Sequence, residues 1–342
     1  MTQQHGKKIM IVTAPANGKR FCGETNYYEQ LLTAVANSGG KGYVFPLDKN
    51  PMDRKGFYWD APNRRWVAAF CPIPDIVYNR YPFKIRENKL ACKRFFQWLD
   101  DQHIPCFNTA FFDKLTIATL LKNDAVLSAH APLTEQLRSL EQLRRRLKKY
   151  PVVFLKDIHG AQGRGIWKVV RKGKSYQLHS QRKVFPSLTF PALSCLLQPV
   201  IKQRTLLIQQ GIRSLKTADG VYDFRVLMMK EKKHWQCIGT GIRLAAHGGF
   251  TTHVKYGGKA ASTNAALLRP PQAVVAFIGR HVGRLLDASY PHIREFSMDM
   301  VMDRNRQLWI VDINSKPMSF DENIIQQKRI RKLVNIFLKQ GV

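Results

Sequence analysis

Residues 297–317, SMDMVMDRNRQLWIVDINSKP, decide the fold of this chain. SMDMVM and LWIVDIN are rich in apolar, aromatic and β-branched residues, and the polar DRNR between them is a turn signal, so the stretch predicts a β-hairpin. Asp312 and Asn314 are two residues apart on the second strand, which places both side chains on one face. If the turn holds an even number of residues, for example 303–306, Asp299 shares that face.

Asp299, Asp312 and Asn314 are therefore candidate metal ligands. They place two carboxylates and an amide oxygen on a face otherwise lined by Met, Val, Ile and Trp, where packing gives them no role. Mg²⁺ prefers such hard oxygen ligands and takes one or two carboxylates, while water and phosphate oxygens fill its other positions. The alternative is a half-exposed strand whose polar face lies in water. The hairpin alone leaves both interpretations open.

The composition is that of a globular protein with a large excess of basic residues. The 342 residues are 44% hydrophobic and 23% charged, which is typical of a chain long enough for two or three domains. Lys and Arg number 55 against 24 Asp and Glu, a net charge of +31. Such a surface attracts anionic polymers, nucleic acid or acidic substrates. A solvated surface without a dedicated partner explains the same charge, because the cations are spread along the chain.

Cysteine spacing and hydropathy predict the compartment. The six cysteines lie far apart with no C-x-x-C pair, which favours reduced thiols over a disulfide framework or a zinc site. The apolar run at residues 9–12 is too short for a signal peptide, and no run approaches the ~20 residues of a membrane-spanning helix. We expect a cytoplasmic protein without a membrane span.

The N-terminal third predicts an α/β layer. KKIMIVTAP, YYEQLLTAVANSGG and KGYVFPL indicate a strand, a helix and a strand, whereas the polar residues 49–63 indicate a loop or insertion. Asn79 and Arg80 follow a short strand at 76–78, at the position where α/β folds place ligand-contacting residues. Arg80 is thus a candidate substrate contact, although an arginine at a strand end is more often merely solvated.

Further along, APLTEQLRSLEQLRRRLKKY has Thr134 at a helix N-cap position and predicts an amphipathic helix with a basic outer face. PVVFLKDIHGAQGRGIWKVVRKG then predicts two strands joined by a glycine-rich loop, with Lys156 ending the first strand. Glycines let backbone N–H groups approach phosphate oxygens, although a simple turn is the alternative and no Walker pattern is present. TLLIQQGI, YDFRVLMM and HWQCIGTGIRLAA predict strands, and Asp223 and Arg225 share one face of theirs.

The order of these motifs resembles the ATP-grasp fold, and most closely the YheC/YheD family of endospore coat-associated ATP-grasp proteins. The resemblance lies in KRFCGETNYYEQL, PDIVYNR, FNTAFFDK, LIQQGI followed by DFRV, and WIVDINSKP, and it spans nearly the whole chain. It implies an α/β (α+β) fold with three parts. These are an N-terminal Rossmann-like pre-ATP-grasp domain at 1–118, a small ATP-grasp subdomain with the glycine-rich loop at 119–210, and a C-terminal subdomain with the metal site at 211–342.

The resemblance also implies roles for individual residues. ATP-grasp proteins hold the nucleotide phosphates with two lysines, which match Lys114 and Lys156, and a glycine-rich loop closes over the triphosphate. A strand edge presents backbone groups to the adenine, and magnesium ligands and two arginines near the γ-phosphate and the acyl-phosphate complete the site. The matching residues are Gly160, Gly163 and Gly165 for the loop, Leu207, Ile208, Gln209 and Gln210 for the edge, Asp299, Asp312 and Asn314 for magnesium, and Arg225 and Arg243 for catalysis.

Two positions depart from the family pattern. Asp312 stands where the family usually has Glu, and its shorter side chain reaches less far; His253 lies in a loop that commonly supplies Asn. The resemblance implies an ATP- and Mg²⁺-dependent ligase that joins an unidentified carboxylate to an amine or similar nucleophile through an acyl-phosphate, and the basic charge favours a polyanionic substrate.

Two other functions stay open. A nucleotide-binding structural or assembly protein of the spore coat, with little turnover, is favoured by Asp312. A binder of polyanions or nucleic acid is favoured by the charge alone, because no nucleic-acid recognition motif accompanies it.

Overall fold

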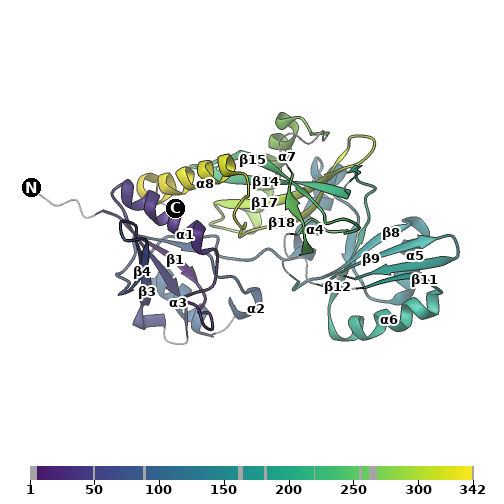
Figure 1. The fold of residues 1–342 in the computed structure, drawn as a ribbon, viewed down its shortest axis with the longest axis horizontal. Helices are drawn as coiled ribbons and strands as arrows, with labels where there is room; N and C mark the ends of the chain where they lie inside the picture. Colours follow the sequence, from purple (N-terminus) through teal and green to yellow (C-terminus); the bar gives the residue numbers. More distant parts are fainter. Residues whose placement is uncertain are drawn as a thin grey trace, which may run out of the picture.

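The structure, a computed structural model, describes residues 6–48, 51–87, 90–160, 165–180, 183–218, 220–253, 256–261 and 268–340. Its strands form three sheets that follow one another along the chain. In Figure 1 the N-terminal sheet (purple to blue) and the second sheet (teal) lie at opposite ends, with the third sheet (green to yellow) between them. The mixed α/β architecture predicted from the sequence is confirmed.

The N-terminal sheet has the strand order β4-β3-β2-β1-β5-β6, and β2, β1, β5 and β6 run parallel. The sequence indicated a loop or insertion at residues 49–63. In the structure, β3 and β4 form an antiparallel hairpin that includes part of this stretch. The elements are β1 (Lys8–Thr13), α1 (Thr25–Asn37), β2 (Lys41–Pro46), η1 (Pro51–Asp53), β3 (Lys55–Asp60), β4 (Arg65–Phe70), β5 (Ile76–Asn79), α2 (Lys84–Glu87), α3 (Leu90–Asp101) and β6 (Cys106–Phe107).

The second sheet is antiparallel, with the order β11-β10-β9-β8-β12-β7. Leucines of α5 and α6 pack on one face of it, and the opposite face turns toward the third sheet. Ser139, and not Thr134 as predicted, caps α5, because Thr134 belongs to a short strand. The elements are α4 (Lys114–Asn123), η2 (Leu127–His130), β7 (Thr134–Gln136), α5 (Leu140–Lys149), β8 (Val152–Asp157), β9 (Ile166–Lys172), β10 (Ser175–His179), β11 (Val184–Leu188), α6 (Phe190–Gln203) and β12 (Leu206–Gln210).

The third sheet has the order β16-β15-β14-β17-β18, with β13 paired to β14. The predicted hairpin is β17 and β18, so β18 is the edge strand. The elements are β13 (Lys216–Thr217), β14 (Gly220–Glu231), β15 (His234–Leu244), β16 (Lys259–Ala260), α7 (Gln272–Ser289), β17 (Glu295–Met302), β18 (Leu308–Asn314), α8 (Asn323–Asn335) and η4 (Ile336–Gln340). Each sheet falls within one of the ranges 1–118, 119–210 and 211–342, whose boundaries stay a prediction.

A continuous hydrophobic cluster joins the first sheet to the third. Ile9 and Ile11 of β1 and Leu31 of α1 belong to the same cluster as Leu333 of α8 and Phe337 of η4. The C-terminal helix therefore packs on its own chain, and α8 (yellow) lies beside α1 in Figure 1. Among the described residues, no helix combines the length and the apolar character needed to cross a lipid bilayer.

Candidate active site

A cavity of about 300 Å³ between the second and third sheets is lined by six of the fourteen predicted site residues. β8, β9 and β12 line it on one side, and β14, β15, β17 and β18 line it on the other. Concave sites between two sheets that carry a few convergent polar groups are typical ligand sites. The predicted residues that line the cavity are Lys156, Gln209, Gln210, Arg243, Asp299 and Asp312, together with His253.

Asp299 and Asp312 lie opposite each other because of a β-bulge. The turn after Met302 holds five residues, 303–307, and not the even number considered above. An odd turn alone would pair Asp299 with Val311 and send Asp312 to the other face. The register shifts by one residue at Val311, so Asp299 pairs with Asp312, and both Val311 and Asp312 line the cavity.

Lys156 reaches the same bulge from the second sheet. Its Nζ donates a hydrogen bond of 2.9 Å to the carbonyl oxygen of Val311. Burial lowers the pKa of Lys156, and the nearby Asp312 carboxylate partly opposes this effect. The ammonium is therefore tied to the strand that carries Asp312, while the cavity remains accessible beside it.

Lys114, the second predicted phosphate ligand, begins α4. Its Nζ donates to the carbonyl oxygens of Gly160 (2.7 Å) and Asp157 (3.1 Å), so it holds the start of the glycine-rich loop. Lys114 lines a smaller hollow next to the main cavity, and Lys156 and Asp312 line both. The two predicted lysines thus flank one continuous region.

Arg243 is the centre of the charged network in the cavity. Its Nε and Nη2 each donate to Asp223 at 2.9 Å, and Nη2 lies 3.0 Å from Asp299 Oδ1. The Thr252 hydroxyl donates a short hydrogen bond to Asp223. Burial raises the pKa of Asp223, whereas for Asp299 the guanidinium groups of Arg243 and Arg225 outweigh burial and lower the pKa. Asp299 is therefore held as a carboxylate.

Arg225 and Asn314 are not part of the cavity lining. Arg225 pairs in register with Asp299, but its Nη1 and Nη2 donate at 3.0 Å to the carbonyl oxygens of Ser319 and Met318. Burial lowers its pKa to about 10. Asn314 is exposed, and its Nδ2 lies 3.4 Å from Asp312 Oδ2. Arg225 therefore supports the segment after β18, and its predicted catalytic role stays untested.

The glycine-rich loop is described only at its ends, since Gly163 lies outside the described residues. Asp157 joins the two ends: its N–H donates to the carbonyl of Gly165 (2.8 Å), and its carbonyl accepts from the N–H of Gly160 (3.0 Å). Gly165 has a φ of +70°, and a Cβ placed there would lie 2.6 Å from Asp157 Cβ. This position requires glycine for both conformation and space.

The predicted adenine edge needs a correction. Leu207, Ile208 and Gln209 do not form a free strand edge, because β12 pairs with β8 on one side and with β7 on the other. The N–H of Gln210 donates to the carbonyl of Leu133 at 2.8 Å. The backbone of these residues is therefore paired with neighbouring strands and the segment before β7. Gln209 and Gln210 nevertheless line the cavity. Their contact with adenine stays a prediction.

The sequence reasoning did not assign several residues of the cavity. Lys168 of β9 lines it, and burial lowers the pKa of this lysine. Phe250, from the loop after β15, packs against the rings of Phe154 and His179 with centroids 6.4 and 6.1 Å apart, so it joins the two walls. A lone aromatic residue in the polar GGFTTH loop was the available signal.

The donors present fit a magnesium ion. Asp299 Oδ1 is buried and makes no aligned hydrogen bond, although Arg243 is close, and Asp312 lies opposite it across the hairpin. Within the described ranges, no group of three His, Cys, Asp or Glu side chains forms a metal site. Two carboxylates with phosphate and water oxygens satisfy Mg²⁺, whereas zinc would require more protein ligands.

The chain is similar in sequence or in fold to several known proteins. Endospore coat-associated protein YheD of Bacillus subtilis (strain 168) is 27% identical over 308 residues, covering 85% of this chain and 67% of YheD. D-alanyl-alanine synthetase A from Vibrio cholerae O1 biovar eltor str. N16961 has a TM-score of 0.60 at 11% identity, with 99% of this chain and 100% of that chain covered. The ATP-grasp ligase PsnB, complexed with minimal precursor, Mg and ADP, has a TM-score of 0.54 at 12% identity, with 97% and 96% covered.

These likenesses confirm the ATP-grasp fold. A family model of YheC/D-like ATP-grasp proteins matches residues 103–340, which is most of the chain and includes all the residues that line the cavity. The chain belongs to the YheC/D-like ATP-grasp family.

Proposed function

We propose that this protein is an ATP- and Mg²⁺-dependent ligase that joins a carboxylate to an amine or a related nucleophile. The observation that carries the proposal is the convergence of Lys156, Arg243, Asp299 and Asp312 on one cavity. Two cations and two carboxylates suit a magnesium-bound triphosphate. The names of two structures with the same fold, a D-alanyl-alanine synthetase and an ATP-grasp ligase, support the proposal.

The proposed reaction has two steps. An oxygen of the substrate carboxylate attacks the γ-phosphorus of ATP, the bond to the bridging oxygen breaks, and ADP leaves with an acyl-phosphate formed. The amine then attacks the acyl carbon and loses a proton as inorganic phosphate departs. Neither step requires a protein nucleophile, so the protein must position the reactants and neutralise charge.

The residues of this chain divide these tasks. Lys156 would contact the phosphates from the second sheet, while Arg243, which Asp223 holds in place, would face the transferred phosphoryl group. Asp299 and Asp312 would hold Mg²⁺, whose bound form neutralises phosphate charge. Phe250 joins the walls of the cavity and helps to exclude water.

Calorimetric titration with ATP tests the nucleotide site, with and without Mg²⁺. We expect the parent to bind ATP only weakly without Mg²⁺, and both Lys156→Ala and Asp312→Ala to lose the Mg²⁺-dependent binding. Lys328→Ala is the control, because Lys328 is exposed on α8. Absence of binding by the folded parent would contradict the proposal. Release of ADP with mixtures of carboxylates and amines then tests ligation.

A second candidate function is nucleotide binding with little turnover in a spore-coat protein. Asp312 carries one methylene less than glutamate, so it reaches less far toward bridging metal ions. The name of the relative, endospore coat-associated protein YheD, supports a spore-coat association for this chain. Binding of ATP without release of ADP, whichever acceptor is added, would favour this function.

Binding of a polyanion is the third candidate. The outer face of α5 and the residues beside it expose a group of cations, and the chain as a whole carries a net charge of +31. Titration with a DNA duplex at several salt concentrations tests this function, since phosphate contacts produce a steep salt dependence. The exposed cations are Arg138, Arg144, Arg145, Lys148 and Lys149.

A further inference from the structure

The N-terminal sheet has a switch point in its strand order, of the kind beside which α/β folds bind ligands. Its parallel strands run β2-β1-β5-β6, so the chain leaves β1 toward one side and later returns on the other. Ligands of open α/β sheets bind beside such a reversal, at the carboxyl ends of the strands. The loops there carry Glu24 after β1, Asn79 and Arg80 at the end of β5, and Asn108 after β6.

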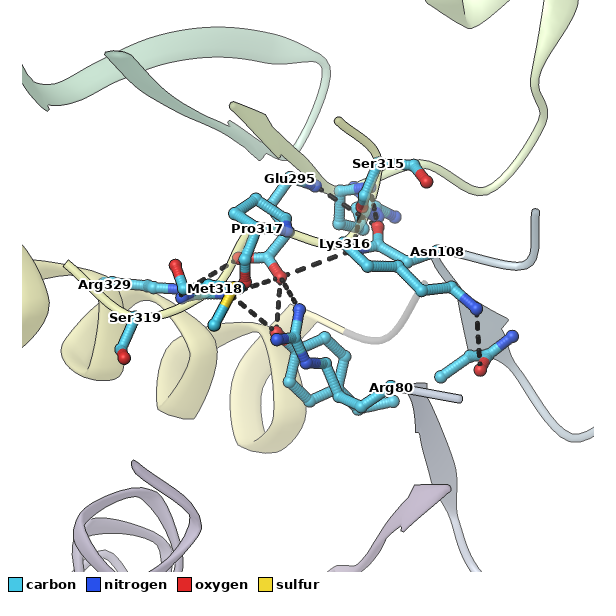
Figure 2. A network of polar contacts seen from close by, with 12 residues as sticks. Arg80, Asn108, Glu295, Ser315, Lys316, Pro317, Met318, Ser319 and Arg329 are labelled. Atoms are coloured by element: carbon cyan, nitrogen blue, oxygen red, sulfur yellow. Dashed lines mark hydrogen bonds and ion pairs between the residues drawn. The ribbon is translucent and has the colours of Figure 1, made fainter. Parts of the chain in front are cut away.

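A segment of the same chain, residues 315–319, contacts these loops, and we name it the clasp segment. Figure 2 shows it between the side chains of Arg329 and Asn108. Asn108 Nδ2 donates to the carbonyl of Ser315 at 3.1 Å, and Ser319 N donates to Glu24 at 2.8 Å. The groups that would contact a ligand in other α/β folds thus contact the backbone that directly follows Asn314.

Lys316 makes the deepest contact of the clasp segment. Its side chain is only 5% exposed, and its Nζ donates to Glu87 Oε1 (2.6 Å), Asn79 Oδ1 (3.1 Å) and the carbonyl of Tyr81 (3.2 Å). Asn79 Nδ2 also donates to Glu87 Oε1 at 2.7 Å, which fixes the acceptor group. All three ammonium protons have acceptors, so this is a built site for one lysine.

A buried ion pair of Arg329 and Glu295 contacts the backbone of the clasp segment. Arg329 and Glu295 are both 0% exposed, and Arg329 Nε and Nη2 donate to the Glu295 carboxylate at 2.9 Å each. The same guanidinium donates to the carbonyls of Pro317 (3.0 Å) and Met318 (3.2 Å). Arg80, the candidate substrate contact, lies in this network, 3.7 Å from Glu295. The segment therefore has fixed neighbours on both sides.

The clasp segment directly follows β18 in the chain, so its contacts restrict where the carboxyl end of that strand can lie. This strand is the edge of the third sheet, so only β17 pairs with it. The turn fixes its first residues, but its carboxyl end, which carries Asp312 and Asn314, runs directly into Lys316. An anchor two residues beyond Asn314 limits how far that end can move away from β17.

We propose that Lys316 is a positioning residue that holds the carboxyl end of β18, and with it Asp312, in the geometry that binds magnesium. The metal role of Asp312 rests on the proposed function. The N-terminal sheet thereby takes part in the site through Lys316, without lining the cavity.

Two variants test the proposal. Lys316→Met removes the ammonium but leaves the Glu87 carboxylate buried without its cation, which destabilises the folded state. Lys316→Met/Glu87→Gln removes both charges and keeps an amide near Asn79. Lys328→Met is the control, because Lys328 is an exposed lysine of the same part of the chain. Circular dichroism melts establish which variants are folded.

The first readout is amide hydrogen exchange without nucleotide, which is independent of the proposed function. We expect peptides that contain residues 310–314 to exchange at least about tenfold faster in the folded double variant than in Lys328→Met, while β14 is unchanged. Equal exchange in both proteins would overturn the positioning role of Lys316.

The second readout is the Mg²⁺ concentration that half-saturates ATP binding. We expect this Mg²⁺ concentration to rise about tenfold in the double variant, because removing a group that orients a metal ligand typically weakens metal binding by that amount or more. The affinity for ATP in EDTA should change less than about twofold. An unchanged Mg²⁺ requirement would overturn the link to the metal. If the parent shows no Mg²⁺-dependent binding while exchange rises in the variant, the proposed function fails and Lys316 is an anchor of the fold alone.

Discussion

Asp299 and Asp312 face each other across β17 and β18 although the turn between their strands holds an odd number of residues. Val311 provides the shift, because two residues of β18 oppose one residue of β17 at the bulge. The carbonyl of Val311 accepts the hydrogen bond of Lys156, so the bulge also joins the second sheet to the third. One residue thus sets both the carboxylate pair and the position of a predicted phosphate ligand.

Replacing Asp312 tests the metal assignment. We expect Asp312→Asn to weaken Mg²⁺-dependent ATP binding at least about tenfold, because an amide cannot offer an anionic oxygen. Its free energy of unfolding should fall by about 1 kcal/mol or less: Asp312 forms no ion pair in the described ranges, but its carboxylate lies near the buried ammonium of Lys156. Calorimetry and urea denaturation measure the two effects.

Asp312→Glu is the matched control, since it retains the charge and adds only one methylene. We expect it to keep Mg²⁺-dependent ATP binding. If Asp312→Asn and Asp312→Glu bind alike, Asp312 is not a metal ligand.

Arg243→Met should destabilise the protein by about 3 kcal/mol, because it leaves the buried carboxylates of Asp223 and Asp299 without their cation. Urea denaturation measures the change. Arg65→Met provides the comparison: Arg65 also pairs with an aspartate, Asp60, but its side chain is 68% exposed, so its loss should cost less than about 1 kcal/mol. Equal losses in the two variants would show that the Arg243 network contributes no more than a surface pair.

Gly165→Ala should weaken ATP binding and destabilise the protein. A positive φ costs a residue with a Cβ about 1–2 kcal/mol, and the close approach to Asp157 adds to this. Gly173→Ala separates the two effects, because Gly173 has a φ of +60° and a Cβ added there would meet nothing within 4 Å. In thermal melts, Gly173→Ala should destabilise the protein less than Gly165→Ala does. In calorimetry, Gly173→Ala should bind ATP with the affinity of the parent.

Glu135 should contribute stability that depends on pH. Hydrogen bonds from Arg146, both 2.6 Å long, lower the pKa of Glu135 below its ordinary value of 4.5. The contribution is therefore complete above pH 4.5 and declines as the pH falls through the lowered pKa of the folded protein. Both side chains are about 30% exposed, so we expect Glu135→Gln to cost about 0.5–1 kcal/mol at pH 7.

Urea denaturation of the parent and of Glu135→Gln between pH 7 and pH 3 measures this dependence. The difference between their unfolding free energies should shrink toward zero at the acidic end. A difference that grows as the pH falls would reverse the sign and contradict the pKa shift.

Local patterns in the sequence predicted the elements that have strong periodicity. The hairpin of β17 and β18, the strands β8 and β9 on either side of the glycine-rich loop, and the helix α1 are present where the sequence pattern indicated them. Asp299 and Asp312 lie together as predicted, but the bulge at Val311 achieves this, and not simple alternation after an even turn.

Features that depend on distant partners could not be predicted. β7 consists of three polar residues, Thr134–Gln136, and it is a strand because it pairs with β12. Its own sequence does not indicate a strand, so Thr134 was interpreted as a helix cap. The bulge at Val311 depends on packing that no local pattern encodes. Arg225 shares a strand with Asp223, but the carbonyls of Met318 and Ser319 attract its guanidinium away from the cavity.

The cluster that contains Ile9, Ile11, Leu333 and Phe337 has a consequence for synthesis on the ribosome. The first sheet leaves the exit tunnel long before its packing partners in α8 and η4, which are far from it in the sequence. At about 5–20 residues per second, completing the chain takes on the order of tens of seconds, and during that time apolar residues of α1 and β1 lack their final cover. We therefore expect nascent chains that end before α8 to recruit chaperones, and chains that include α8 and η4 to lose that association.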